Sequence, residues 1–416
     1  MREIRIITAD DLDAFVNLTA NAYPGIELTT VEKKQRFKER LQSVQADSRV
    51  HLVGLFQAGK LLGGMRLYDF TMQLLSTKVL VGGVGGVAVD LLHKKEKVAY
   101  DMLQFFLHYY REKGASLTAL YPFRPDFYKK MGYGYGTKMQ RYYIKPASLP
   151  GGGDKTVVAR LNRADKDALA ACYARYLART NGLFERFDSL WETVFQDPAW
   201  HTVGIRNGSR ISGYIGFKFE RDPQRSFLDN DMLINEWVYE TPADFMALST
   251  FLHAQADQIN RIIFNTQDEY FHFLLEDPRN GTDKLLAPTL YHESNTQGVG
   301  LMYRVMDVPG LFMALAEHNF NGQTCCLEIV LTDSFLPENG GSTVIVFENG
   351  RCRLTPNTQP DVTMQIDVSE FSSLVTGVVP FKALFAYGLA TLSDPAYVDV
   401  LDQLFAAPKP ICLTSF

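Results

Sequence analysis

The sequence repeats itself at an offset of 150 residues, and this repeat constrains the fold more than any other feature of the chain. Residues 53–63 read VGLFQAGKLLG and residues 203–213 read VGIRNGSRISG, so two β-hairpins fall into register. The second contains Asn207-Gly208, a strong hairpin-turn dipeptide. Residues 87–90 align in the same way with residues 237–240, and a helical pattern follows each. The repeat predicts two copies of one α/β unit.

In the first copy, a strand leads into a loop that is suited to bind phosphate. The strand over 82–89 is rich in glycine and valine, and three lysines follow within four residues, at Lys94, Lys95 and Lys97. A helical pattern then begins at Val98. Loop amide groups and a helix N-terminus can hold an anion, and lysines supply the opposite charge. We therefore expect a phosphate-bearing ligand here.

The second copy differs at the matching point. It carries acidic residues, Glu240 and Asp244, in place of the basic loop. Carboxylates at this position would repel a pyrophosphate. We expect the second copy to be a degenerate scaffold that binds no such ligand.

Composition and charge narrow the classes of partner. A chain of 416 residues suggests two or three domains, and a net charge of −5 argues against a nucleic-acid partner. No apolar run is long enough to span a bilayer and the first residues do not read as a signal peptide, so we expect a cytoplasmic protein without a membrane partner. The five cysteines form no C-x-x-C pair, and we expect reduced thiols and no metal site.

A third pattern begins after a polar, glycine-containing stretch around residues 293–300. A short helix is predicted near residues 308–317. Strands are predicted over 324–333, 342–348, 351–355 and 362–367, and helices over 369–376, 380–387 and 396–405. In pattern, this region resembles the sterol carrier protein type 2 fold. The predicted domains are therefore 1–150, 151–292 and 293–416.

Three local stretches carry a resemblance to a known family. They are residues 87–99, the aromatic segment 121–134, which reads YPFRPDFYKKMGYG, and the last residues, 410–416. Together with the domain order, they resemble the Eis-type (enhanced intracellular survival) N-acetyltransferases of the GNAT superfamily. The resemblance implies an α/β (α+β) fold class, with two tandem GNAT-like domains followed by a sterol-carrier-like α+β domain. It also implies a homo-oligomer, a hexamer in that family.

The resemblance implies acetyl-coenzyme A (acetyl-CoA) as co-substrate and assigns residues to it. Backbone groups of the strand would pair with the pantetheine arm, and the loop and helix start would meet the pyrophosphate. The residues are Val87, Ala88, Val89, Lys94, Lys95, Lys97, Val98 and Ala99. Lys97 stands where the family has its first glycine, a position where a residue without Cβ favours close approach.

The resemblance also implies two catalytic groups and a residue that attracts the acceptor amine. Tyr128 takes the position of the tyrosine that protonates the departing thiolate, and Phe416 supplies a terminal carboxylate as base for the amine. Glu27, in the loop between two predicted helices at 12–22 and 30–42, is the candidate to attract a cationic amine.

The expected activity is direct transfer of an acetyl group, in a ternary complex, to a primary amine of a small cationic molecule or to lysine. Two alternatives stay open. If Lys97 prevents coenzyme A binding, the chain is a non-catalytic ligand or lipid carrier or a regulatory protein. If the acyl pocket is larger, the donor is a longer acyl-CoA.

Overall fold

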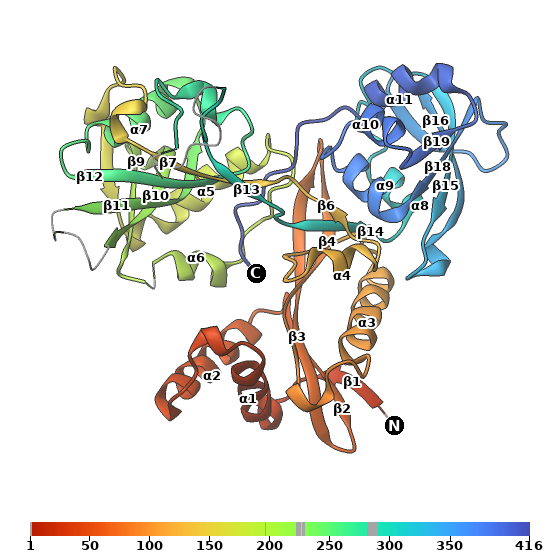
Figure 1. The fold of residues 1–416 in the computed structure, drawn as a ribbon, viewed down its shortest axis with the longest axis horizontal. Coiled ribbons are helices and arrows are strands. Elements are labelled where there is room, and N and C mark those ends of the chain that lie inside the picture. The colour runs from red at the N-terminus through yellow and green to blue at the C-terminus, as the bar shows by residue number, and fades with distance from the viewer. Residues whose placement is uncertain (1, 196, 222–225, 227–228, 281–289) are drawn as a thin grey trace. The chain divides into compact units, whose positions relative to one another are not determined.

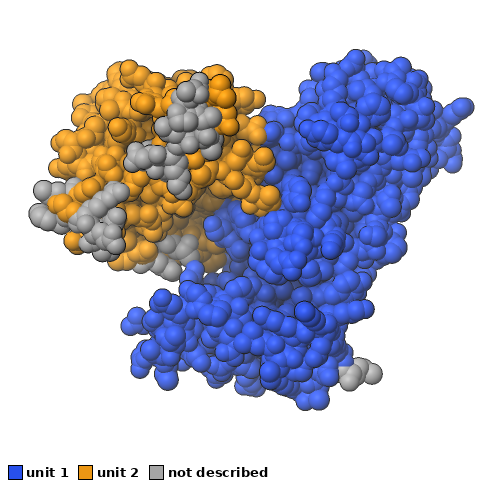
Figure 2. Space-filling model, viewed as in Figure 1, with its two compact units in different colours: residues 1–136, 301–410, 414–416 blue, residues 137–300, 411–413 orange. Residues whose placement is uncertain are grey.

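The computed structural model forms two compact units, each described by itself (Figures 1 and 2). Unit 1 comprises residues 1–136, 301–410 and 414–416, and unit 2 comprises residues 137–300 and 411–413. The residues described are 2–195, 197–221, 226, 229–280 and 290–416.

Unit 1 contains a seven-stranded sheet with the order β1-β2-β3-β4-β5-β14-β6. Its strands are β1 (Arg2–Ile6), β2 (Val50–Gln57), β3 (Lys60–Leu74), β4 (Thr77–Val89), β5 (Leu117–Leu120), β6 (Gly134–Tyr135) and β14 (Met302–Val305). Although β14 comes late in the sequence, it pairs antiparallel with both β5 and β6. The sheet is therefore completed by a strand from the far side of the segment that forms unit 2.

Helices cover both faces of this sheet (Figure 1). They are α1 (Leu12–Ala22) and α2 (Val31–Gln45) on one face, and α3 (Val98–Glu112) on the other. Neighbouring strand residues point to opposite faces, and here both are glycines. A Cβ atom on Gly63 would lie 2.6 Å from Val98 of α3, and one on Gly64 would lie 2.5 Å from Phe15 of α1. The two glycines thus let both helices pack closely.

Strands β4 and β5 run together only briefly. They pair in parallel from Val81 to Val84 and from Leu117 to Leu120, and no pairing with β5 continues beyond these residues. On its other side β4 stays paired with β3 up to Val89, with a bulge between the pairs Arg66–Gly85 and Gly64–Ala88. Among the described residues, the end of β4 therefore has no strand partner on the β5 side.

The C-terminal part of unit 1 has a five-stranded sheet, β17-β16-β15-β18-β19, with short helices. Its elements are α8 (Val308–Ala314), β15 (Cys325–Thr332), β16 (Gly341–Glu348), β17 (Arg351–Leu354), β18 (Val362–Asp367), α9 (Val368–Val375), α10 (Phe381–Ala386), β19 (Ala390–Leu392) and α11 (Val398–Leu404). The helices and strands predicted for this region are confirmed, with ends that differ by a few residues.

Unit 2 contains a second seven-stranded sheet, β13-β7-β12-β11-β10-β9-β8. Its elements are β7 (Met139–Ile144), β8 (Val158–Leu161), α5 (Lys166–Leu177), α6 (Asp188–Val194), β9 (Trp200–Asn207), β10 (Arg210–Arg221), β11 (Asn230–Tyr239), α7 (Pro242–His253), β12 (Ile259–Thr266) and β13 (Thr296–Gly298). Strand β9 has the bounds of β2 plus 150 residues, and β11 ends 150 residues after β4. The predicted repeat of one α/β unit is confirmed.

The mixed α/β fold class is confirmed, whereas the domain ends at 150 and 292 stay predictions. Within the described ranges, no helix combines the length and apolar character needed to cross a membrane. Nor do these ranges bring together three or more His, Cys, Asp or Glu side chains that could hold a metal ion.

Candidate functional site

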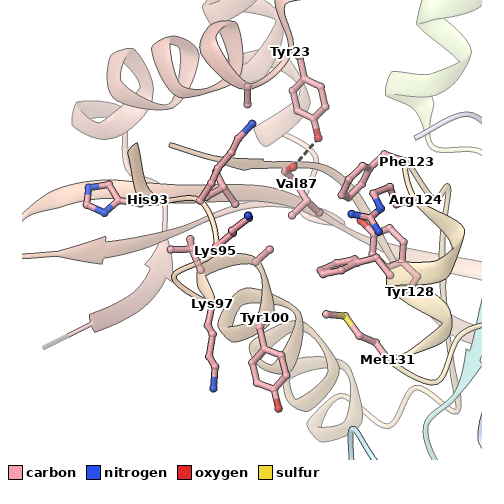
Figure 3. A pocket seen from close by; sticks show the side chains of 16 residues that line it. Tyr23, Val87, His93, Lys95, Lys97, Tyr100, Phe123, Arg124, Tyr128 and Met131 are labelled. Carbon is pink, nitrogen blue, oxygen red and sulfur yellow. Dashed lines mark hydrogen bonds between the residues drawn. The ribbon is translucent and has the colours of Figure 1, made fainter. Parts of the chain in front are cut away.

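A cavity of about 670 Å³ lies in unit 1 between the end of β4, the start of α3 and the segment around α4 (Pro125–Lys129) (Figure 3). Most of the residues predicted from the sequence line it: Val87, Val89, Lys94, Lys95, Lys97, Val98, Ala99 and Tyr128. Three predicted residues are not among its lining. They are Ala88, whose side chain packs in the core beside α1, together with Glu27 and Phe416.

The open edge of β4 borders this cavity through Val87 and Val89. Peptide groups at such an edge can pair with an extended ligand as a neighbouring strand would. One of them already has a partner, because the Tyr23 hydroxyl donates a hydrogen bond of 2.6 Å to the Val87 carbonyl oxygen (Figure 3). A carbonyl oxygen has a second lone pair, so Val87 can still accept a bond from a ligand. Tyr23 begins the loop that carries Glu27, but nothing in the sequence indicated its hydrogen bond to Val87.

The basic loop ends in a left-handed residue at the start of α3. Lys97 is the N-cap of α3 with φ of 63°, and Lys95 also has a positive φ, 68°. This conformation favours glycine, which explains why a glycine suits position 97. The Lys97 side chain extends beside Tyr100 and away from Val87, with its Nζ atom 5.9 Å from the Tyr100 ring centroid (Figure 3). Its bulk is therefore directed along the helix and not toward the strand edge.

The start of α3 offers amide groups to a ligand. The first hydrogen bond within the helix runs from the Asp101 amide to the Lys97 carbonyl oxygen, at 2.9 Å. The amides of Val98, Ala99 and Tyr100 thus have no acceptor inside the helix. With the partial positive charge of the helix N-terminus and three exposed lysines, they form a donor set that fits a diphosphate.

Tyr128 lies on α4 and is 3% exposed. Its ring makes edge contacts with Phe123, Phe127 and Tyr133, with centroids 5.2 to 5.9 Å apart. Burial raises the pKa of Tyr128 well above its usual value, and the nearby phenols of Tyr133 and Tyr23 raise it further. The hydroxyl is therefore protonated at neutral pH, as a proton donor must be.

The C-terminal part of unit 1 packs against the α4 segment. Lys129 forms an ion pair with Glu370 of α9. A Cβ atom on Gly132 would lie 1.7 Å from an Arg304 nitrogen atom, and one on Gly134 would lie 2.1 Å from the Ser369 carbonyl oxygen. The glycines of the aromatic segment thus serve close packing behind Tyr128, a role that the sequence did not reveal.

Arg304 itself is fully buried on β14. It donates a hydrogen bond of 2.7 Å to Asp333, and both side chains have no exposed surface. A buried charge needs such a partner. The signal that could have found it is an arginine within the apolar run of residues 302–306.

Phe416 lies against Gly85 of β4. The Phe416 carbonyl carbon is 2.8 Å from the position of a Cβ atom on Gly85. Its ring packs among Tyr68, Phe70 and Tyr121, with centroid distances of 5.6, 4.8 and 5.3 Å. The Tyr121 hydroxyl also donates to the Thr414 carbonyl oxygen, at 3.1 Å. An aromatic slot therefore fixes this residue beside the bulge of β4.

Glu27 does not join these groups. It is exposed, and its carboxylate forms an ion pair of 3.4 Å with Lys33. Glu27 is not among the residues that line the cavity, and an exposed pair of this kind contributes little energy.

In unit 2 the equivalent helix start is already capped. Only two residues separate β11 from α7, and Thr241 and Asp244 form a capping box. Glu240, the residue before them, forms ion pairs with Arg175 and Arg210. A carboxylate therefore occupies the position where the first copy offers free amide groups.

Unit 2 also holds three residues of the C-terminal segment. The Ile411 amide donates to the Asn181 carbonyl oxygen at 2.8 Å, and the Cys412 amide donates to the Gln267 side chain at 2.6 Å. Arg186, buried and paired with Glu236, donates to the Leu413 carbonyl oxygen at 3.0 Å.

Family models match three parts of the chain. A model described as an acetyltransferase (GNAT) domain matches residues 3–136, and a second with the same description matches residues 177–305. A sterol carrier protein domain matches residues 312–413.

The chain is similar to solved structures over its whole length and to a curated protein over part of its length. A GCN5-related N-acetyltransferase from Anabaena variabilis is 16% identical with a TM-score of 0.84, and Eis1 from Mycobacterium abscessus is 20% identical with a TM-score of 0.77; both matches cover 100% of each chain. A Streptomyces avermitilis protein called an uncharacterized N-acetyltransferase is 23% identical over 265 residues. That match spans 60% of this chain and 63% of the relative, which is less than two thirds of its length.

Proposed function

We propose, from the premise that the chain is an Eis-type GNAT acetyltransferase with a C-terminal sterol carrier domain, that it acetylates the primary amine of a small molecule or of lysine. The donor is acetyl-CoA, and the transfer is direct, in a ternary complex. The observation that carries the proposal is the cavity of unit 1, which combines an open strand edge, a basic helix start and a buried tyrosine.

The donor would be bound by backbone groups in its middle and by charge at its diphosphate. Val87 and Val89 pair with the pantetheine arm along the edge of β4. The amides at the start of α3 and the side chains of Lys94, Lys95 and Lys97 hold the pyrophosphate. Because the second copy has a capped helix start, we assign the donor to the first copy alone.

Tyr128 and Phe416 then move protons. Acetyl-CoA supplies the acetyl group as a thioester; the amine nitrogen bonds to the carbonyl carbon as the carbon–sulfur bond breaks. An amine with a pKa near 10 must first lose a proton, which the Phe416 carboxylate accepts. Tyr128 donates its proton to the departing thiolate and regains one as the acetylated nitrogen gives up its second proton. A backbone N–H group of β4 polarises the thioester carbonyl during the attack.

The cysteines support direct transfer without an acyl-enzyme. A thiol must ionise to act as a nucleophile. Burial raises the pKa of Cys172 and of Cys325 to about 12 and that of Cys352 to about 11, and no cysteine lines the cavity. The homo-oligomeric state, a hexamer in the resembling family, and the cytoplasmic location stay predictions.

Acetyl-CoA calorimetry and a rate assay with Tyr128→Phe test this proposal. The wild type should bind acetyl-CoA and acetylate amines in a panel detected by mass spectrometry. The variant should bind the donor with similar affinity and lose roughly 10²-fold or more in kcat, the range for a lost general acid. Tyr387→Phe, at an exposed tyrosine of the C-terminal part, is the matched control. Absence of acetyl-CoA binding by the wild type would favour the carrier alternative.

A further inference from the structure

Arg66 is a half-buried cation in the seven-stranded sheet of unit 1. It lies on β3 within the run Leu61–Leu67, which is otherwise apolar or glycine and is buried apart from this side chain. Among the described residues, none accepts a hydrogen bond from its guanidinium group or forms an ion pair with it. A guanidinium removed from bulk water without a partner is unusual, since buried charges are normally paired.

The position of Arg66 brings it to the reacting end of β4. Its register partner across the strands is Gly85, against which Phe416 lies. A Cβ atom on the next residue, Gly86, would lie 3.4 Å from the Arg66 Nε atom. Arg66 therefore borders the bulge on the face where Phe416 also lies.

The charge of Arg66 also acts on two tyrosines, Tyr23 and Tyr68. The Tyr23 hydroxyl group donates to the Val87 carbonyl oxygen. Burial raises the pKa of Tyr23, and the Arg66 charge opposes that rise. Burial likewise raises the pKa of Tyr68, and both Arg66 and Arg40 oppose it. Arg40 lies on α2, is exposed, and also has no ion-pair partner among the described residues. The charges of Arg66 and Arg40 thus both act on Tyr68, whose ring packs against Phe416.

Two lysines of α2 form ion pairs, unlike these arginines. Lys33 pairs with Glu27 at 3.4 Å and Lys38 pairs with Asp13 at 2.7 Å. Arg66 differs from the cations of α2 because it is half-buried at the bulge of β4 and has no ion-pair partner among the described residues.

From this geometry, and resting on the proposed function, we propose that the acceptor carries a carboxylate close to its primary amine, and that Arg66 binds this carboxylate. An amine that reaches the Phe416 carboxylate lies beside Arg66, because both groups flank Gly85. A planar guanidinium matches a carboxylate with two parallel hydrogen bonds. Arg66 is thus a specificity-determining residue for amino-acid-like acceptors.

The same charge disfavours acceptors that are cationic at every end. A second ammonium group near the reacting amine would approach the Arg66 guanidinium group, and like charges at short range repel. The acceptor amine is cationic before it loses its proton, so a neighbouring carboxylate makes the whole group neutral. We therefore expect the acceptors to be small zwitterions.

The test compares acceptor pairs that differ only in the carboxylate. Initial rates are measured with acetyl-CoA and a panel of L-amino acids, each beside its own amide, with a polyamine as the cationic reference. The wild type should show kcat/KM at least about 10-fold higher for the acids, as expected for a charged hydrogen bond. In Arg66→Gln the ratio of acid to amide should fall to near one, and Arg66→Lys should keep part of it. Arg353→Gln, in the C-terminal part, is the control and should keep the full ratio.

The outcomes distinguish failure of the role assigned to Arg66 from failure of the proposed function. Equal or faster turnover of the amides or of the polyamine by the wild type would overturn the role of Arg66 and leave acetyltransfer intact. An unchanged ratio in Arg66→Gln would do the same. Absence of both acetyl-CoA binding and turnover of every acceptor would instead overturn the proposed function itself. Because the wild-type comparison needs no variant, a poorly folded Arg66→Gln protein does not remove the test.

Discussion

Phe416 lies directly against Gly85 on β4, with its carbonyl carbon 2.8 Å and its carbonyl oxygen 3.1 Å from where a Cβ atom on Gly85 would lie. A residue with any side chain at position 85 would have to displace Phe416 or the strand. The glycine is therefore a condition for the position of the group to which we assign the base.

Gly85→Ala should consequently impair the reaction more than donor binding. The added methyl group should move the Phe416 carboxylate by an ångström or more, and displacements of this size cost roughly 10²-fold in rate. Gly216→Ala on β10 is a matched control, because its Cβ atom would meet only Glu236, at 4.0 Å. Steady-state kcat and calorimetric affinity for acetyl-CoA are measured for both. A kcat for Gly85→Ala equal to that of the control would contradict the assigned role of Phe416.

Variants of Lys97 separate the effect of its charge from the effect of its bulk. Because the side chain extends beside Tyr100, its removal should cost only the charge. Lys97→Ala and Lys97→Gly should both bind acetyl-CoA about 2- to 5-fold more weakly, the range for one charge near a helix end. Calorimetry at one fixed salt concentration measures this. Tighter binding by Lys97→Gly than by the wild type would show instead that the lysine obstructs the pyrophosphate.

Gly132 and Gly114 have nearly the same left-handed backbone but different surroundings. Their φ angles are 80° and 78°, yet a Cβ atom on Gly132 would collide with Arg304 whereas one on Gly114 would meet nothing within 4 Å. Gly114→Ala should lower the free energy of unfolding by about 1 kcal/mol, the cost of the conformation alone. Gly132→Ala adds overpacking of a buried ion pair and should cost about 3 kcal/mol. Denaturant unfolding of the two variants measures the difference, and equal losses would refute the close packing behind Tyr128.

Asp69 on β3 makes part of the stability depend on pH. Burial raises the pKa of its carboxyl group, but hydrogen bonds from His51, Lys113 and Tyr110 together outweigh burial and lower the pKa to about 2. A carboxyl with a lowered folded-state pKa stabilises the protein above the unfolded value of 3.8, and the effect is lost as pH falls toward 2. Asp69→Asn should therefore cost about 2 kcal/mol at pH 7, and the difference from the wild type should shrink between pH 4 and pH 2. Unfolding free energies across this range measure it; a difference that does not change with pH would contradict it.

The elements could be predicted from the sequence because their patterns are local. The helix over 12–22 and the strand over 362–367 have the expected bounds, since periodicity and turn residues mark both ends. The 150-residue repeat also appears directly in the letters. The basic loop was readable for the same reason, as its charges and the helix that follows are contiguous.

The remaining features depend on contacts between distant segments. Nothing near Tyr23 indicates that its hydroxyl group reaches Val87, 64 residues later. The insertion of β14 next to β5, and the packing of Arg304 on Gly132, join positions more than 170 residues apart. Glu27 illustrates the opposite case, because its charge is visible in the sequence whereas its ion pair with Lys33 is not.

Completion of the first sheet by β14 has a consequence for the order of events during synthesis. Strand β5 has β4 on one side and β14 on the other, so residues 1–136 leave the ribosome before the strand that covers β5 has been made. Until residue 305 emerges, the nascent chain presents an unpaired strand edge, which is a template for wrong pairing. A fragment cut after the aromatic segment would keep that exposed edge permanently, and its aggregation would reflect a missing strand and not an unstable core.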